Sequence, residues 1–434
     1  MKVGIISINA HTKVLNFASP LHSYAFWSFL NEHGIEAKII DYKPIYYRKY
    51  NPKYPLFYYI DHPRKTEEEQ REYLKKWKNL FWEREKRYQR FQEFIDKYYV
   101  KTKRCYNEKT LDQKKFGFDC YICATDVIWK WNKGYGFDRG FFLACGCMKG
   151  KRKIAYAASR GASQYTPDQE AEFKTYLRDF DYISVREKSL KDYCETLTDQ
   201  RVTQVLDPVF LKSREFYEDL AIEPKEKGYV LIYIVMEKAP SLVTAAVNFA
   251  KAHNLEVIEL SELLEDRTIP EGTRHEIVYG IGVEEWLGYM QHAEYIFTNS
   301  FHACCFSIIL HKKFWAGKRA GDKVDSVLGL MGLTNRRLGP DCEDGTFADE
   351  PIDWDEVESR KETYRRQSAE YILNAIHGIP EEPRKPGDAH QTGANPADKE
   401  NKQEAQPDQA ETEKRQETQK TGSIWKKIAG AVKK

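Results

Sequence analysis

The segment from Ala293 to Leu310 constrains the fold more than any other part of this sequence. A short apolar run over 295–298 is followed by Asn299 and Ser300, and then by an apolar stretch over 301–310. Asn and Ser commonly cap helices, so the pattern predicts a strand, a polar turn and a buried helix with His302 in its first turn. Because ligands of open α/β sheets bind where strands end and helices begin, His302 is a candidate proton donor at an anion site. The alternative is a packed histidine in a capping turn.

Predicted strands and helices also alternate along the first half of the chain. Strands are predicted over 3–8, 36–42, 118–124, 153–158, 182–186 and 203–206, and helices over 21–33, 66–100 and 168–180. Polar residues recur where these strands end, namely Thr125, Asp126, Ser159, Arg160, Arg186 and Asp207. Since the carboxyl ends of parallel strands meet at one edge, we expect these side chains to line one lip of a cleft.

A second alternating series begins near Gly228. It predicts strands over 229–235, 255–260, 295–298 and 312–315, and helices over 241–253, 283–293, 301–310 and 324–331. The fold class is therefore α/β with two Rossmann-like domains, over 1–212 and 228–350. A helix over 351–380 is expected to cross back over the first domain.

Charge and motifs exclude several classes of function. The net charge of +2 and the acids interspersed in the 66–100 helix argue against nucleic-acid binding. The Gly-x-Gly-x-x-Gly fingerprint is missing, so a nicotinamide or flavin enzyme is not expected. No signal peptide and no apolar run of transmembrane length are visible, which predicts a cytoplasmic protein.

The nine cysteines include two close pairs, Cys120 with Cys123 and Cys145 with Cys147. Such spacing is compatible with a zinc site. However, Cys120 and Cys123 lie in a predicted strand, where a spacing of three places side chains on opposite faces. We therefore predict free thiols and no metal site.

The C-terminal region differs in composition from the rest. Residues 381–422 hold no large apolar residue and predict a disordered linker. Residues 423–434 form an amphipathic pattern in which Ile424, Trp425, Ile428 and Val432 face one way and four lysines supply charge. This predicts a helix on the anionic inner face of the cell membrane, with a frayed solubilising tail as the alternative.

Six short motifs, in order and at strand ends, carry a family resemblance. They are the loop and helix start at 16–25, Ala-Thr-Asp-Val-Ile-Trp at 124–129, Tyr-Ala-Ala-Ser at 156–159, Ser-Val-Arg-Glu at 184–187, Asp-Pro at 207–208 and Ser-Phe-His-Ala at 300–303. Together they resemble the polysaccharide pyruvyl transferase family over residues 1–376. Ala18, Ala124 and Ala303 stand where that family usually has Gly, and His22 where Gln is common.

The resemblance implies a GT-B-like architecture and the transfer of pyruvate from phosphoenolpyruvate to a sugar diol, giving a cyclic ketal. No cofactor is expected beyond this donor substrate, and the acceptor is expected to be a sugar or a lipid-linked oligosaccharide. Such chemistry needs a general acid, here His302, and a bidentate cation for a carboxylate or phosphate, here Arg186. A nucleotide-sugar glycosyltransferase and a non-catalytic partner in polysaccharide assembly are the alternative functions.

The remaining site assignments each have a structural alternative. Arg186 could instead form a structural ion pair with Glu187 or Asp181. Ser300 and Asn299 are predicted to cradle an anion, and Asp126 with Thr125 to meet a sugar hydroxyl, although all four residue types also cap turns and helices. Further candidate contacts, which could equally be packing or surface residues, are Ser159, Arg160, Asn16, His11, His22 and Lys318.

Overall fold

The computed structural model describes residues 1–8, 11, 14–48, 50–53, 66–236, 239–260, 274–339, 342–345, 347 and 349–381. The predicted membrane-surface helix over 423–434, and all of the predicted linker except Glu381, lie outside the described residues. All the strands and helices described below belong to one unit, Met1–Pro383.

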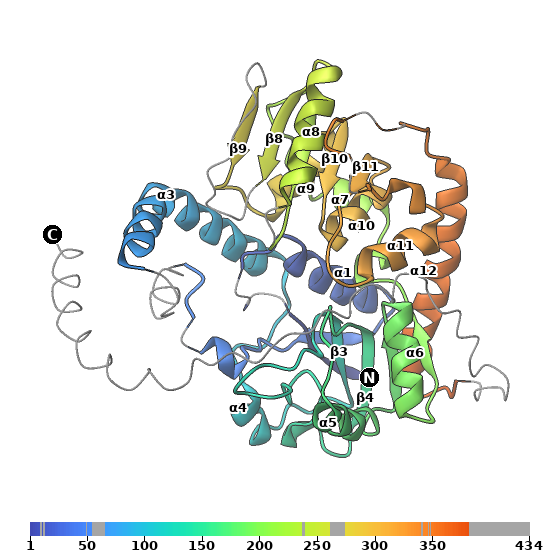
Figure 1. The fold of residues 1–434 in the computed structure, drawn as a ribbon. Coiled ribbons are helices and arrows are strands. Elements are labelled where there is room, and N and C mark those ends of the chain that lie inside the picture. Colours follow the sequence, from blue (N-terminus) through green and yellow to red (C-terminus); the bar gives the residue numbers. More distant parts are fainter. Residues whose placement is uncertain are drawn as a thin grey trace. The chain divides into compact units, whose positions relative to one another are not determined.

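Two parallel sheets form the framework of the chain (Figure 1). The N-terminal sheet has the order β2-β1-β3-β4-β5-β6, with strands β1 (Lys2–Ile6), β2 (Glu36–Ile39), β3 (Cys120–Asp126), β4 (Arg152–Ala158), β5 (Tyr182–Val185) and β6 (Val202–Gln204). The C-terminal sheet has the order β11-β10-β7-β8-β9, with strands β7 (Tyr229–Tyr233), β8 (Glu256–Leu260), β9 (His275–Val278), β10 (Tyr295–Thr298) and β11 (Lys313–Ala316). The predicted fold class, two Rossmann-like sheets in series, is confirmed.

Helices connect and cover these strands. The α-helices are α1 (Ala18–Glu32), α3 (Glu67–Tyr98), α4 (Glu108–Asp112), α5 (Pro167–Leu177), α6 (Lys188–Leu197), α7 (Arg214–Glu218), α8 (Pro240–Ala252), α9 (Val283–His292), α10 (Phe301–Ile309), α11 (Lys323–Met331) and α12 (Trp354–His377). Short 3-10 helices are η1 (Ile45–Tyr47), η2 (Gly146–Met148), η3 (Pro208–Leu211) and η4 (Thr334–Arg336). None of the described helices is long and apolar enough to span a membrane.

One hydrophobic core joins helices from both halves of the chain. Leu21 of α1 and Phe91 of α3 belong to the same buried cluster as Trp286 of α9 and Ile308 of α10. Helix α1 is consequently buried along most of its length, between the two sheets (Figure 1). This shared core brings the first turn of α10 close to residues of the N-terminal sheet.

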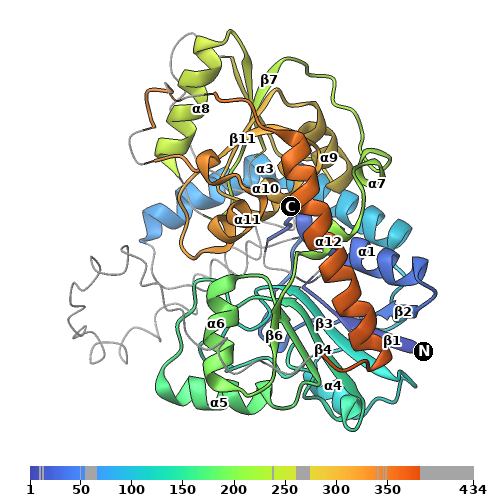
Figure 2. The same ribbon diagram turned by 90° about the vertical axis from the view of Figure 1, so that its right-hand side faces the viewer.

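The last described helix, α12, extends from one sheet to the other (Figure 2). Its first turns contribute Val357 to the core shared with the C-terminal sheet, and its later turns contribute Ile372 and Ile376 to the core behind the N-terminal sheet. Ser368 accepts a hydrogen bond from the backbone N–H of Leu206 at 2.9 Å. The helix therefore fastens the segment after β6 in place.

Several predicted strands end earlier than expected. The first strand ends at Ile6 rather than residue 8, β2 at Ile39 rather than residue 42, and β7 at Tyr233 rather than residue 235. Strand β6 ends at Gln204 rather than residue 206, because Leu206 bonds to α12. Strand β3 ends at Asp126, where Thr125 and Asp126 adopt positive φ angles of 124° and 66°. Non-glycine residues rarely take such angles, and they concentrate at functional sites.

Several elements were not predicted from the sequence, among them the short helices α4 and α7, helix α6 and strand β9. Helix α6 begins directly after Arg186 and Glu187, and its buried residues are spaced as on one helical face, at Leu190, Cys194 and Leu197. Strand β9 is four residues long and none of its residues is fully buried, so it carries little hydrophobic periodicity.

Candidate active site

The start of α10 is fixed by hydrogen bonds from its flanking residues. Ser300 accepts a bond from the Ala303 N–H at 3.4 Å, as a helix cap does. The Asn299 amide accepts from the Val235 N–H at 2.9 Å and donates to the Val235 carbonyl at 3.2 Å. Ser300 and Asn299 therefore act as structural residues in their described contacts, and they set the position of His302.

His302 faces the N-terminal sheet from the first turn of α10. Its Nε2 lies 3.4 Å from Oδ2 of Asp207, and its side chain is only 6% exposed. Its ring stacks on that of His22 in α1, with centroids 5.5 Å apart and planes inclined by 25°. The predicted proton donor thus has a buried carboxylate beside one ring nitrogen and a second imidazole against its face.

Asp207 is held in one orientation by three donors. Its Oδ2 accepts from Nη1 of Arg186 at 2.7 Å and from the Thr125 hydroxyl at 3.2 Å, and its Oδ1 accepts from the Val209 N–H at 3.2 Å. Burial works against ionisation, but His302 and Arg186 outweigh it and hold the pKa of Asp207 well below its usual range. The residue beside His302 is therefore a fixed negative charge.

Arg186 is enclosed by acidic groups. Besides Asp207, its guanidinium lies 3.3 Å from Oδ1 of Asp126 and 3.6 Å from Oε1 of Glu187, and it stacks at 4.4 Å over the Phe301 ring. Only 2% of the side chain is exposed. These contacts fit the alternative that Arg186 is structural, although its shortest ion pair is with Asp207, and Asp181 instead accepts from the Lys153 N–H.

His22 is the more deeply enclosed partner in this stack. Burial is the largest of the effects that together lower the pKa of His22 to about 4; Asp207 and Asp126 act against it, whereas the charges of His302 and Arg186 act with it. His22 is therefore neutral at neutral pH. A ring that is neutral at neutral pH is a poor general acid, so His22 does not compete with His302 for the role of proton donor that the sequence predicts for His302.

The end of β3 contributes the strained pair of residues. The Thr125 hydroxyl shares its single proton between the Ala157 carbonyl at 2.9 Å and Asp207 at 3.2 Å, and Asp126 contacts Arg186. Nζ of Lys323, in the first turn of α11, lies 3.9 Å from Oδ1 of Asp126. Burial disfavours charge on both groups: it lowers the pKa of Lys323, whereas Lys323 and Arg186 outweigh burial at Asp126 and keep that carboxyl ionised.

Several predicted contact residues make other contacts. The Ser159 hydroxyl accepts from the Gly161 N–H, and Asn16 accepts from the Ala18 N–H in the turn before α1. Arg160 stacks on Tyr193 at 4.2 Å, and Lys318 is exposed. The structure therefore gathers His302, Arg186, Asp126, Thr125 and His22, and leaves these four residues with capping, stacking or surface positions.

The alanines that replace glycine are all buried. Ala124 and Ala303 are members of hydrophobic clusters, and Ala18 is 1% exposed. The positive φ angles fall at Thr125 and Asp126 and not at Ala124. The methyl groups of Ala18, Ala124 and Ala303 therefore contribute to packing.

Asp207 and Lys323 are not among the site residues predicted from the sequence. Asp207 was noted only as a polar strand end and as part of an Asp-Pro motif, and its contact with His302 joins residues 95 positions apart. Lys323 had no such signal, because a lysine at a helix start resembles any surface residue.

Cys120 and Cys123 have the arrangement expected of residues three apart in a strand. Cys120 and Cys123 lie in separate hydrophobic clusters on opposite faces of the N-terminal sheet. The candidate metal-ligating group within the described residues consists instead of His11, Asp41 and Cys105.

A cavity of about 600 Å³ lies elsewhere, where β4 begins. Its basic residues include Arg139 and Lys153, which already pair with Asp112 and Asp179. Ligands of parallel sheets bind at the carboxyl ends of strands, so this cavity is a weaker candidate than the region of His302.

Comparisons with known proteins agree with the family resemblance that the sequence motifs carry. A family model described as polysaccharide pyruvyl transferase matches residues 21–316, more than half of the chain. No curated protein sequence gives a significant match.

Similar solved structures share low sequence identity. They include the UDP-GlcNAc 2-epimerase from Neisseria meningitidis bound to UDP-GlcNAc (11% identity, TM-score 0.45, covering 87% of this chain and 100% of the other). A putative UDP-N-acetylglucosamine 2-epimerase from Listeria monocytogenes (9%, 0.47, 89% and 99%) and the calicheamicin glycosyltransferase CalG4 (11%, 0.42, 87% and 99%) are similar to the same extent.

Proposed function

The chain belongs to the polysaccharide pyruvyl transferase family, and from this premise we propose that it moves pyruvate from phosphoenolpyruvate onto a sugar diol as a cyclic ketal. Such ketals would be made during the synthesis of a capsule, an exopolysaccharide or a cell-wall glycan. The observation that carries the proposal is the His302–Asp207 pair at the start of α10, 3.4 Å apart and almost fully buried.

The proposed reaction is a sequence of proton transfers and additions. His302 protonates the methylene carbon of the donor, which makes the adjacent C2 electrophilic. A sugar hydroxyl adds to C2 and gives its proton back to His302. The C2–O bond to phosphate then breaks with its electron pair leaving on inorganic phosphate, which makes C2 electrophilic again. A second hydroxyl adds to C2 and closes the ring, and its proton passes to the released phosphate. No electrons are exchanged with a redox partner, so the proposal includes no redox cofactor.

Each residue around His302 has a separate role in this proposal. Asp207 holds the ring and stabilises its positive charge when it is protonated. Arg186 and Thr125 fix Asp207, which makes Arg186 a positioning residue, and the predicted role of Arg186 as a donor clamp becomes the competing hypothesis. Lys323 and the N-terminus of α10 would meet the donor's anionic groups, because a bound phosphate would offset the cost of keeping Lys323 charged.

The test is to identify the donor. The full-length protein is incubated with phosphoenolpyruvate or with nucleotide sugars, and the melting temperature is measured for each. Phosphoenolpyruvate should raise it, and phosphate release should then depend on a sugar with two suitably spaced hydroxyls. A rise with nucleotide sugars alone would instead favour a glycosyltransferase, and no rise with any donor would favour a non-catalytic partner.

We further propose that the enzyme is cytoplasmic and works at the inner face of the cell membrane, held there by residues 423–434. The amphipathic sequence of this segment and its four lysines support the proposal, with about 1 kcal/mol per lysine near an anionic surface. Truncation after Gly422 should abolish binding to anionic vesicles and leave activity on a soluble acceptor unchanged. Equal partitioning of the full-length and truncated proteins would contradict this proposal.

A further inference from the structure

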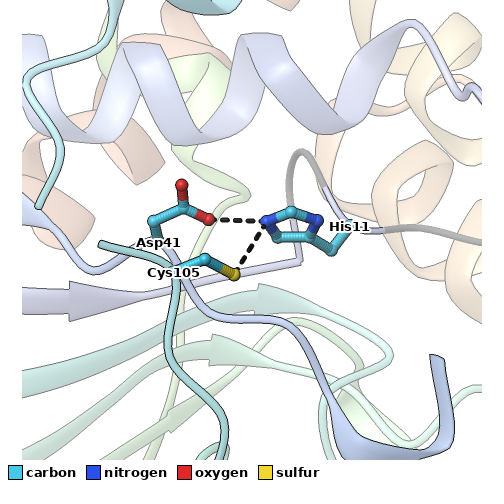
Figure 3. Close-up of side chains that lie close together, drawn as sticks. All are labelled: His11, Asp41 and Cys105. Atoms are coloured by element: carbon cyan, nitrogen blue, oxygen red, sulfur yellow. Dashed lines mark hydrogen bonds and ion pairs between the residues drawn. The ribbon is translucent and has the colours of Figure 1, made fainter. Parts of the chain in front are cut away.

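Three potential metal ligands meet at one point in the N-terminal half (Figure 3). Nε2 of His11 lies 2.5 Å from Oδ1 of Asp41 and 3.4 Å from Sγ of Cys105. All three ligand atoms lie within 4.8 Å of one another. The residues come from three separate segments of the chain, so their convergence is a product of the fold.

The cluster lies at the ligand-binding edge of the N-terminal sheet. His11 follows β1 and Asp41 follows β2, and the carboxyl ends of these parallel strands share one edge with those of β3 and β5. Cys105 belongs to the segment after α3. Its residue is exposed, while the His11 and Asp41 side chains are 24% and 12% exposed, so an ion from solvent can reach the ligand atoms.

The arrangement does not fit a Cys-His-Asp nucleophile system. In such a system the carboxylate and the thiol contact different nitrogens of the imidazole, so that a proton can pass between them. Here Asp41 and Cys105 both approach Nε2. One nitrogen cannot donate its single proton fully to both, whereas three ligand atoms within 4.8 Å of one another can bind one cation.

We propose that His11, Asp41 and Cys105 bind a divalent cation of the zinc class, as three protein ligands with the fourth position open. Imidazole, thiolate and carboxylate are the zinc ligands found in proteins, and three of them leave one site for water or a substrate atom. This departs from the expectation, drawn from the sequence, that the chain has no metal site. The site does not depend on the transferase reaction.

The distances are close to those of a tetrahedral site. Bonds of about 2.0–2.3 Å to zinc place neighbouring ligand atoms about 3.3–3.7 Å apart. The observed separation of 3.4 Å between Nε2 and Sγ already fits, and the His11–Asp41 pair must open by less than 1 Å. Lys101 contacts the other carboxylate oxygen, Oδ2, at 3.2 Å, which leaves Oδ1 for the cation.

The experiment measures metal binding by the purified full-length protein. After treatment with chelator and addition of Zn²⁺, one equivalent should remain bound through dialysis. Replacement by Co²⁺ should give a near-ultraviolet thiolate-to-metal absorption band. Cys105→Ser should abolish this band, and Cys105→Ser and Asp41→Asn should each lower Zn²⁺ affinity by about 100-fold or more.

Matched controls separate this site from other thiols and histidines. Cys147→Ser removes a partly exposed thiol outside the cluster, and His253→Ala removes a histidine that bonds to a backbone carbonyl; both variants should bind one equivalent as the wild type does. Circular dichroism of every variant checks the fold. Failure of the wild type to retain zinc, or a cobalt–thiolate band that persists in Cys105→Ser, would overturn the proposal whether or not the protein transfers pyruvate.

Discussion

The two sheets contribute very different chemistry to the region where they meet. The N-terminal sheet supplies a dense set of ionised groups, in which Arg186 is enclosed by Asp126, Glu187 and Asp207. The C-terminal sheet supplies mostly neutral groups. The side chains of Thr298, Asn299 and Ser300 form hydrogen bonds with backbone groups near the start of α10. His302 contacts Asp207 across this boundary, Phe301 stacks on Arg186, and Lys323 lies near Asp126.

This difference suggests a division of labour. The acidic side, with its strained residues at the end of β3, fixes the position of one carboxylate beside His302. The C-terminal sheet fixes the backbone at the start of α10 and so positions the imidazole of His302. The substitutions below test whether chemistry depends on the imidazole, on the carboxylate, on the arginine behind it or on the second histidine, in decreasing order of expected effect.

The largest effect is expected at His302. His302→Ala removes the proposed acid and should reduce phosphate release from phosphoenolpyruvate and acceptor by about 10²–10⁴-fold. Steady-state turnover and circular dichroism measured on the same preparation are the check. A well-folded variant with turnover near that of the wild type would remove His302 from the mechanism.

Asp207→Asn tests the carboxylate. The amide keeps the size of the side chain but loses the charge that supports the protonated ring, so kcat should fall about 100-fold with little change in donor KM. Breaking a buried ion pair with Arg186 should also lower the free energy of unfolding by about 3–5 kcal/mol. Kinetics are therefore measured well below the lower melting temperature. Unchanged kcat in the destabilised variant would make the pair purely structural.

Arg186→Lys distinguishes positioning from substrate binding. Lysine keeps the charge but cannot bridge Asp207 and Asp126 as the guanidinium does. If Arg186 acts through Asp207, kcat should fall about 10-fold and stability should drop, with donor KM nearly constant. A large rise in donor KM at unchanged stability would support the clamp assigned from the sequence. The pattern of kcat against KM therefore decides between the two roles.

The sequence predicted the strands and helices around this site because their apolar runs are bounded by polar residues. The strand and helix over 295–309, with Ser300 as cap and His302 in the first turn, is the best example. Cap and helix are local, so neighbouring residues contain the needed information. The crossing helix α12 was predicted for the same reason.

The contacts between distant residues were not available from local patterns. Nothing near Arg186 in the sequence indicates that its guanidinium pairs with Asp207 and not with a substrate. The same holds for Lys323 beside Asp126, and for the meeting of His11 with Asp41 and Cys105. Side-chain roles depend on which segments the two sheets bring together, and spacing within one segment does not report this.

The smallest effect on turnover is expected at His22. His22→Gln should change turnover by less than about 3-fold, because the neutral ring packs against His302 without donating the reacting proton. Its effect on stability depends on pH. The folded-state pKa of about 4 lies below the ordinary value of 6.5, so the unfolded chain binds more protons between these values and wild-type stability must fall as pH decreases through this window.

The size of this pH effect gives a direct measurement. A shift from 6.5 to about 4 corresponds to roughly 3 kcal/mol, lost progressively as pH falls from about 6.5 to about 4 and fully present above that window. Denaturant unfolding of wild type and His22→Gln at several pH values should show a steeper fall for the wild type. Parallel curves would mean that His22 is not held neutral, and the proton on His302 could then be shared between the two rings. His33→Gln, which removes an exposed histidine bonded to a backbone carbonyl, is the control.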